Sequence, residues 1–120
     1  MAQKSRQAEY IRLNGKYLRE GEELLARGDN AQASEKFWGA AAEIIKAVAA
    51  KSGLQLGTHR GIGEFILSLD KDHPKWGLID AFNAANTLHM NFYEDWLPSE
   101  LVERSAERVR SLVENLRTLL

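Results

Sequence analysis

The sequence predicts an all-α fold, an up-and-down antiparallel bundle of about five helices. Apolar residues recur at three- and four-residue spacing in five segments, and no segment shows sustained alternation of apolar and polar residues. The two prolines, Pro74 and Pro98, stand where helical patterns begin, and glycines cluster between the patterns. Short connections between long amphipathic helices favour antiparallel neighbours.

The first helix is predicted from about Ser5 to Arg27. Its apolar residues share one face: Tyr10, Leu13, Tyr17, Leu18, Leu24 and Leu25. Gly28-Asp29-Asn30 then supplies a glycine that ends this helix and a polar residue that caps the next one.

The second helix is predicted from about Ala31 to Lys51 and carries two apolar stripes. The main stripe contains Ala33, Phe37, Ala40, Ala41, Ile44 and Val48. The other stripe, displaced by roughly a quarter turn, contains Trp38, Ala42, Ile45 and Ala49. A helix that is apolar on most sides is either central in its own bundle or shared with a partner. Both interpretations stay open, and the second one makes the second stripe a homodimer interface.

Three more helices follow. The third has Thr58 as its predicted N-cap and ends near Asp70. The fourth is predicted from about Pro74 to Glu94, and the fifth begins near Pro98-Ser99 and runs almost to the last residue.

Length and composition limit the possible classes of function. The chain has 120 residues, which predicts one domain spanning residues 1–120. It has no cysteine, so disulfides, thiolate metal sites and cysteine nucleophiles are excluded, and we expect a cytoplasmic protein. Its 16 basic and 17 acidic residues give a net charge of −1, which provides no overall field to attract nucleic acid or an anionic membrane. No apolar run is long enough for a membrane span, so we expect no membrane contact.

The three histidines, His59, His73 and His89, are the first candidates for chemistry. No two of them stand three or four residues apart, so the local sequence predicts no metal site. His89 falls near the centre of the apolar stripe of the fourth helix, with Asn86 and Tyr93 three and four residues away. This spacing predicts a polar cluster inside the bundle, in which His89 is a hydrogen-bonded core residue that fixes helix register. A catalytic base or a ligand contact at His89 is the competing interpretation.

His59 and Arg60 fall in the first turn of the third helix, where free backbone N–H groups and the helix dipole attract anions. The preceding loop lacks the lysine and the spacing of a phosphate-binding P-loop, and Gly61-Ile62-Gly63 lacks the third glycine of a dinucleotide fingerprint. We therefore expect no cofactor, and a plain helix connection is the simpler interpretation. Glu43, at the edge of the apolar face of the second helix, is either an inward-facing acid or a rim residue that pairs with a neighbouring helix.

Three stretches of the chain resemble the archaeal PaREP family of small helical proteins. They are residues 28–43 (GDNAQASEKFWGAAAE), Thr58-His59, and residues 86–98 (NTLHMNFYEDWLP). The similarity covers nearly the whole chain. The family in turn resembles a branch of the HEPN group of helical bundles, which often dimerise and include metal-independent ribonucleases, partners of nucleotidyltransferases and components of toxin–antitoxin pairs.

The resemblance also indicates which activity and which residues to consider. HEPN ribonucleases carry an arginine that is followed by four to six residues and then a histidine, and no arginine precedes any histidine of this chain at that spacing. Ribonuclease activity is therefore not implied. Asn91 has no packing role that the spacing predicts, which favours a contact or capping role. The positions within the resembling stretches that are candidates for ligand binding are Trp38, Glu43, His59, His89, Asn91 and Tyr93.

Two classes of function follow. The first is a non-catalytic interaction module, a HEPN-like homodimer that binds a partner protein, with RNA as a further option, through a cleft near His59, His89 and Tyr93. The second is a metal-independent ribonuclease in which His89 acts as base and Arg60 clamps the phosphate.

Overall fold

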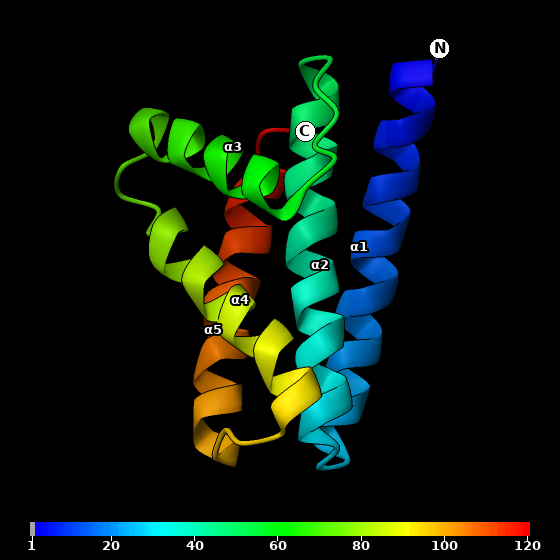
Figure 1. The fold of residues 1–120 in the computed structure, drawn as a ribbon. Coiled ribbons are helices and arrows are strands. Elements are labelled where there is room, and N and C mark those ends of the chain that lie inside the picture. Colours follow the sequence, from blue (N-terminus) through cyan, green and yellow to red (C-terminus); the bar gives the residue numbers. More distant parts are fainter. Residues whose placement is uncertain (1) are drawn as a thin grey trace.

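The computed structural model describes residues 2–120, and these form five α-helices: α1 (Ala2–Ala26), α2 (Asn30–Lys51), α3 (His59–Asp72), α4 (Leu78–Glu94) and α5 (Ser99–Arg117). Helices α1, α2, α4 and α5 run alternately down and up the molecule, and α3 crosses one end of the bundle (Figure 1). The predicted all-α bundle is thus confirmed, with α3 lying across it. Within residues 2–120, no helix has both the length and the apolar character that a bilayer span requires.

Two of the predicted helix starts have the expected capping hydrogen bonds. The Asp29 carboxylate accepts a hydrogen bond from the Gln32 backbone N–H over 3.3 Å, and the Thr58 hydroxyl accepts one from the Gly61 N–H over 2.9 Å. Each side chain satisfies a backbone donor that has no partner within its own helix. The cap on Thr58 fixes where α3 begins, and so it fixes the position of His59.

The fourth helix begins later than the sequence predicts. The proline signal favoured a start at Pro74, but α4 begins at Leu78. Gly77 has a left-handed backbone with φ +63°, which cannot be part of a right-handed helix, and residues 74–77 form a turn instead. The Trp76 N–H donates to the His73 carbonyl over 3.1 Å, and the His73 and Trp76 rings stack 3.9 Å apart.

Helix α2 is the centre of the bundle, because it packs against each of the other four helices. Ala42 is 5% exposed, and Ile45 and Ala49 are completely buried within the single chain. The second apolar stripe of this helix is therefore core, and the prediction that Ala42, Ile45 and Ala49 form a dimer interface is wrong. A helix surrounded by neighbours has the same apolar pattern as a helix shared with a partner.

Helix α1 joins the bundle through a closely packed seam with α2. A Cβ atom added at Gly39 would lie 2.9 Å from the ring of Tyr17, so the two helices meet there without room for a side chain. The buried Asn14 amide donates to the Ala40 carbonyl over 2.7 Å, and its oxygen accepts from the Arg117 guanidinium over 2.9 Å. One polar side chain thus joins α1, α2 and α5.

Candidate functional site

Helices α2, α3 and α4 bring five polar and aromatic side chains together at the surface. We call this group the histidine cluster, and its members are Glu35, Trp38, His59, Asn86 and His89. The centroids of the two imidazole rings are 5.5 Å apart. Tyr93 borders the cluster, with its ring edge-on to His89 at 5.6 Å. The structure therefore unites four of the predicted ligand-binding residues, Trp38, His59, His89 and Tyr93.

His89 is held by a carboxylate from another helix. Its Nδ1 lies 2.7 Å from Oε1 of Glu35, and both side chains are a little under one-third exposed. Since a carboxylate oxygen accepts hydrogen bonds, Nδ1 carries the proton and donates. In the neutral ring, Nε2 then keeps its lone pair.

His59 is held by an amide and by a stacked ring. Its Nε2 lies 2.9 Å from Oδ1 of Asn86, and its ring stacks on Trp38 with centroids 4.5 Å apart and 16° between the planes. The amide oxygen is an acceptor, so Nε2 donates and Nδ1 keeps the lone pair of the neutral ring. The interaction with Trp38 fixes the plane of the imidazole, and the bond to Asn86 fixes its rotation.

The two imidazoles thus present one basic nitrogen each, Nδ1 of His59 and Nε2 of His89. No hydrogen bond within residues 2–120 reaches either atom. Nitrogens of this kind accept protons or bind metal ions. Because Glu35 and Asn86 hold the rings from the other side, the orientation of both rings is set before anything binds.

This arrangement corrects the prediction that His89 belongs to a polar cluster inside the bundle. Its side chain is 28% exposed, and Tyr93, expected beside it in the interior, is 71% exposed. Asn86 contacts His59 instead of His89. Helical spacing placed His89 on the same side as the apolar residues of α4, but at that level the neighbouring helix α2 presents Glu35 and Trp38.

Asn91 has a structural role. It is completely buried, its Oδ1 accepts from the backbone N–H groups of Trp96 and Leu97 at 2.9 and 2.8 Å, and its Nδ2 donates to the Ser34 hydroxyl over 3.0 Å. The predicted capping role is confirmed, since Asn91 secures the chain just after α4 ends. Because the side chain is completely buried, it is not accessible for the ligand contact that was the other expectation.

Glu43 faces helix α1, away from the histidine cluster. Its side chain is 12% exposed and pairs with Lys46 over 3.5 Å, while its Oε2 is buried without a hydrogen-bond partner. Burial raises the pKa of Glu43, and the nearby Lys46 partly offsets this effect. Glu43 is therefore the inward-facing acid of the first interpretation. Its ion pair is with Lys46 of the same helix and not with a neighbouring helix, as the second interpretation expected.

Arg60 belongs to a groove between α3 and α4. Its guanidinium pairs with Glu64 at 3.6 Å, and no ion pair or hydrogen bond within residues 2–120 joins it to His89. The predicted pairing of Arg60 with His89 in a ribonuclease site therefore has no support in the geometry.

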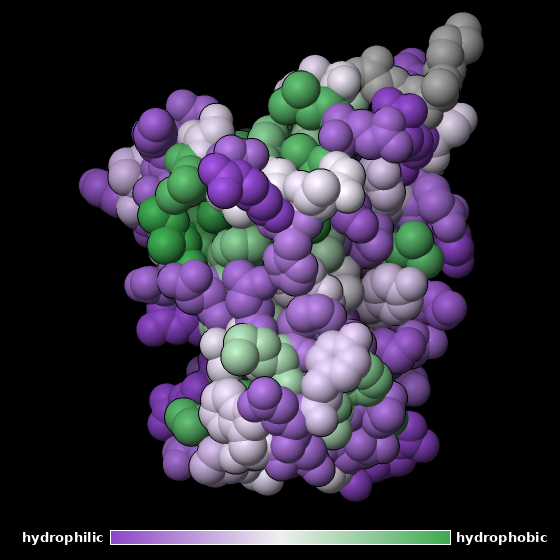
Figure 2. Space-filling model, viewed as in Figure 1, coloured by the Kyte–Doolittle hydropathy of each residue, from purple (hydrophilic) through white to green (hydrophobic). Residues whose placement is uncertain are grey.

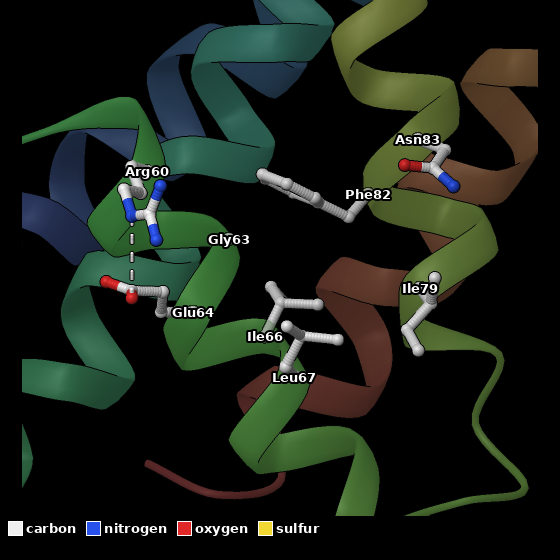
Figure 3. Close-up of a pocket in the computed structure, with 8 residues that line it drawn as sticks. All are labelled: Arg60, Gly63, Glu64, Ile66, Leu67, Ile79, Phe82 and Asn83. Carbon is white, nitrogen blue, oxygen red and sulfur yellow. Dashed lines mark ion pairs between the residues drawn. The ribbon is translucent and has the colours of Figure 1, made fainter.

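The groove has a volume of about 360 Å³ and an apolar floor. Figure 3 shows Ile66 and Leu67 of α3 opposite Ile79 and Phe82 of α4, with Arg60 and Glu64 at the rim. Leu67 is 52% exposed and Ile79 is 38% exposed. Hydrophobic surface gathers at this side of the molecule, where α3 lies over α4 (Figure 2). The spacing of apolar residues in the sequence did not predict this groove.

Glu35 is the member of the cluster that sequence reasoning missed. It stands among the charged residues of α2 and has the spacing of a solvated edge. Its partner His89 is 54 positions away in the sequence. The only local signal is that Glu35 precedes Trp38 by three residues, which places both on one side of α2.

Comparisons with known proteins agree with this fold. The model of the archaeal PaREP1/PaREP8 family matches residues 9–113. A crystal structure of a protein from Sulfolobus solfataricus superposes with a TM-score of 0.80 at 26% sequence identity, covering 89% of this chain and 95% of that one. No curated protein matches the sequence. The HEPN grouping stays a prediction. Because the family match spans most of the sequence, this chain belongs to the archaeal PaREP1/PaREP8 family.

Proposed function

We propose that this protein is a homodimeric interaction module that pairs with a second copy of itself through the groove between α3 and α4. The observation that carries the proposal is the exposed apolar floor of the groove, where Leu67 and Ile79 are 52% and 38% exposed. A large aliphatic side chain left in water gives up about 1.5–3 kcal/mol of burial free energy, so a cluster of such residues favours association.

The exposed residues continue along α4 beyond the groove. A single stripe on the helix runs at alternating four- and three-residue steps through Ile79, Asn83, Asn86, Met90 and Tyr93, all of them exposed except the half-buried Asn86. Met90 is 51% exposed and Tyr93 is 71% exposed. A stripe of this spacing is the pattern that a helix uses when it packs against another helix.

Charge at the rim of the groove favours a second copy as the occupant. Arg60 and Glu64 stand one turn apart on α3, and their side chains are 88% and 65% exposed. A two-fold axis that sets two α3 helices antiparallel brings Arg60 of each copy opposite Glu64 of the other. The rim is therefore complementary to itself. The net charge of −1 per chain adds almost no repulsion between the copies.

Substitutions in and away from the groove test the proposal by light scattering coupled to gel filtration. Wild type should elute as a dimer. Leu67→Glu should elute as a monomer with the helical circular dichroism of wild type. Leu101→Glu is the matched control, because Leu101 is 50% exposed on α5, outside the groove, and this variant should remain dimeric. A wild-type monomer at the highest soluble concentration contradicts the proposal, and so does a Leu67→Glu variant that is still a dimer.

A charge swap tests the antiparallel arrangement itself. Arg60→Glu and Glu64→Arg, each made alone, should raise the dimer dissociation constant about 5-fold, because each dimer contains two such exposed pairs of about 0.5 kcal/mol. The double variant should recover the wild-type constant. A double variant that dissociates more than either single variant rules out this pairing.

A further inference from the structure

We propose that His59 and His89 form a binding site for a divalent transition-metal ion of the Cu²⁺, Ni²⁺ and Zn²⁺ class. The inference rests on the histidine cluster and is independent of the proposed dimer. It concerns Nδ1 of His59 and Nε2 of His89, the two nitrogens that the hydrogen bonds of the cluster leave available.

The partners of the two rings are those that metal-binding histidines use. A histidine that binds a metal through one nitrogen usually donates the N–H of its other nitrogen to a carboxylate or a carbonyl oxygen. His89 donates to the Glu35 carboxylate over 2.7 Å, and His59 donates to the Asn86 amide oxygen over 2.9 Å. Both bonds fix the tautomer that leaves a lone pair for the metal.

The spacing of the rings also suits one shared ion. Metal–nitrogen bonds of about 2.0–2.1 Å and a tetrahedral angle place the centres of two imidazole rings roughly 5 Å apart. The observed separation between centroids is 5.5 Å. The two rings are thus separated by close to the distance that a shared ion requires.

The protein supplies two ligands to the metal ion, and the remaining coordination positions of the ion are open. Among the described residues, no group of three or more histidine, cysteine or carboxylate side chains could hold an ion. Water or a further ligand would complete the coordination, which an exposed location allows, since His59 is exposed and His89 is 28% exposed. Two imidazoles select late transition metals over Mg²⁺ and Ca²⁺, which prefer oxygen ligands.

The fluorescence of Trp38 can report the binding of a metal ion. Its ring lies 4.5 Å from His59 and 5.0 Å from His89, so Cu²⁺ or Ni²⁺ bound between them should quench its fluorescence. Titration of the chelator-treated protein with Cu²⁺ should show saturable quenching with one ion per chain, also seen by calorimetry, and Mg²⁺ should produce neither signal. Following the Irving–Williams order, Cu²⁺ should bind more tightly than Ni²⁺, and Ni²⁺ at least as tightly as Co²⁺, Fe²⁺ and Mn²⁺. Trp38→Phe should remove most of the quenching and keep the heat of binding.

Four variants locate the site. His59→Ala and His89→Ala should each abolish saturable binding. His73→Ala is the control, because His73 stacks on Trp76 at the other end of α3, and it should bind as wild type does. Glu35→Gln should weaken binding about 10-fold, since it removes the charge that supports His89 and keeps both metal-binding nitrogens.

Two results would overturn the inference. One is the absence of saturable Cu²⁺ and Ni²⁺ binding in a wild-type protein with normal circular dichroism. The other is binding that persists when both His59 and His89 are replaced by alanine, which would place the ion elsewhere. Neither result depends on whether the protein is a dimer.

Discussion

The seam between α1 and α2 and the groove between α3 and α4 both join consecutive helices, but only the first is closed. In the seam, Gly21 and Gly39 have no side chain, so an aromatic ring of the facing helix packs directly against each glycine. The Asn14 amide is hydrogen-bonded through both its nitrogen and its oxygen. In the groove, Leu67 and Ile79 stand across an open space. The seam is closed by residues of a single chain, whereas the groove leaves apolar surface in water.

The two regions differ in the types of residue that build them. The seam uses small and polar residues for a close contact, so a change there costs stability. The groove uses large apolar residues that one chain does not cover, so a change there should affect association and leave the fold intact. The histidine cluster lies beside the groove, at the start of α3, where the side chains of three helices meet.

The largest effect is expected from Ile45→Glu in α2, the central helix that packs against each of the other four. Ile45 is completely buried, and an unpaired carboxylate there should destabilise the fold by more than about 4 kcal/mol. Circular dichroism should report an unfolded or strongly destabilised chain. Ile11→Glu on α1, where Ile11 is 37% exposed, should stay folded. A soluble, folded Ile45→Glu monomer would restore the idea that this stripe of α2 is a dimer interface.

Asn14→Ala tests the polar part of the seam. It removes the hydrogen bonds to the Ala40 carbonyl and from Arg117, so the free energy of unfolding should fall by about 2–3 kcal/mol in urea denaturation. Asn83→Ala, at the exposed rim of the groove, should change it by less than about 0.5 kcal/mol. Equal effects at the two positions would mean that the seam is no more tightly specified than the groove.

Gly39→Ala tests the close approach of the two helices. The added Cβ lies 2.9 Å from the Tyr17 ring, and the strain should outweigh the gain in helix propensity and destabilise the protein by about 1 kcal/mol. Gly15→Ala in α1 is the matched control. Its Cβ meets only the flexible end of Arg19 at 3.3 Å, so that variant should be more stable than wild type by up to about 1 kcal/mol. Thermal unfolding that shifts both variants in the same direction contradicts the packing argument.

Glu43→Gln should give the smallest effect, and it depends on pH. Burial raises the pKa of Glu43, so the folded protein binds this proton more tightly than the unfolded chain does. Wild type therefore loses stability as the pH rises through the raised pKa, and the glutamine variant does not share this loss. The variant should gain relative to wild type as the pH rises from about 4 through the raised pKa, in parallel denaturation series. A relative gain that instead grows toward low pH contradicts the sign of the shift.

Most of the fold could be predicted from the sequence because its signals are local. The spacing of apolar residues located five helices, and Asp29 and Thr58 capped two of them as expected. The start of α4 was misplaced because proline is a signal for several kinds of turn. The left-handed conformation of Gly77 then decided where the helix begins.

The candidate site could be predicted only in part because its contacts join distant positions. His59 and His89 were identified as candidates, but their partners Asn86 and Glu35 are 27 and 54 residues away in the sequence. Periodicity identifies the residues of a helix that face inward, but it does not indicate what the neighbouring helix presents at that level. The same limit explains why Ile45 could be interpreted as either core or interface.

Hydrogen–deuterium exchange at low and at high protein concentration tests the contrast between the two regions most directly. If the groove pairs with a second copy, the amides of α3 and of the first half of α4 should exchange more slowly at high concentration, while those of α1 and α2 should not change. Exchange that is independent of concentration throughout the chain, or protection confined to α1, would contradict the account.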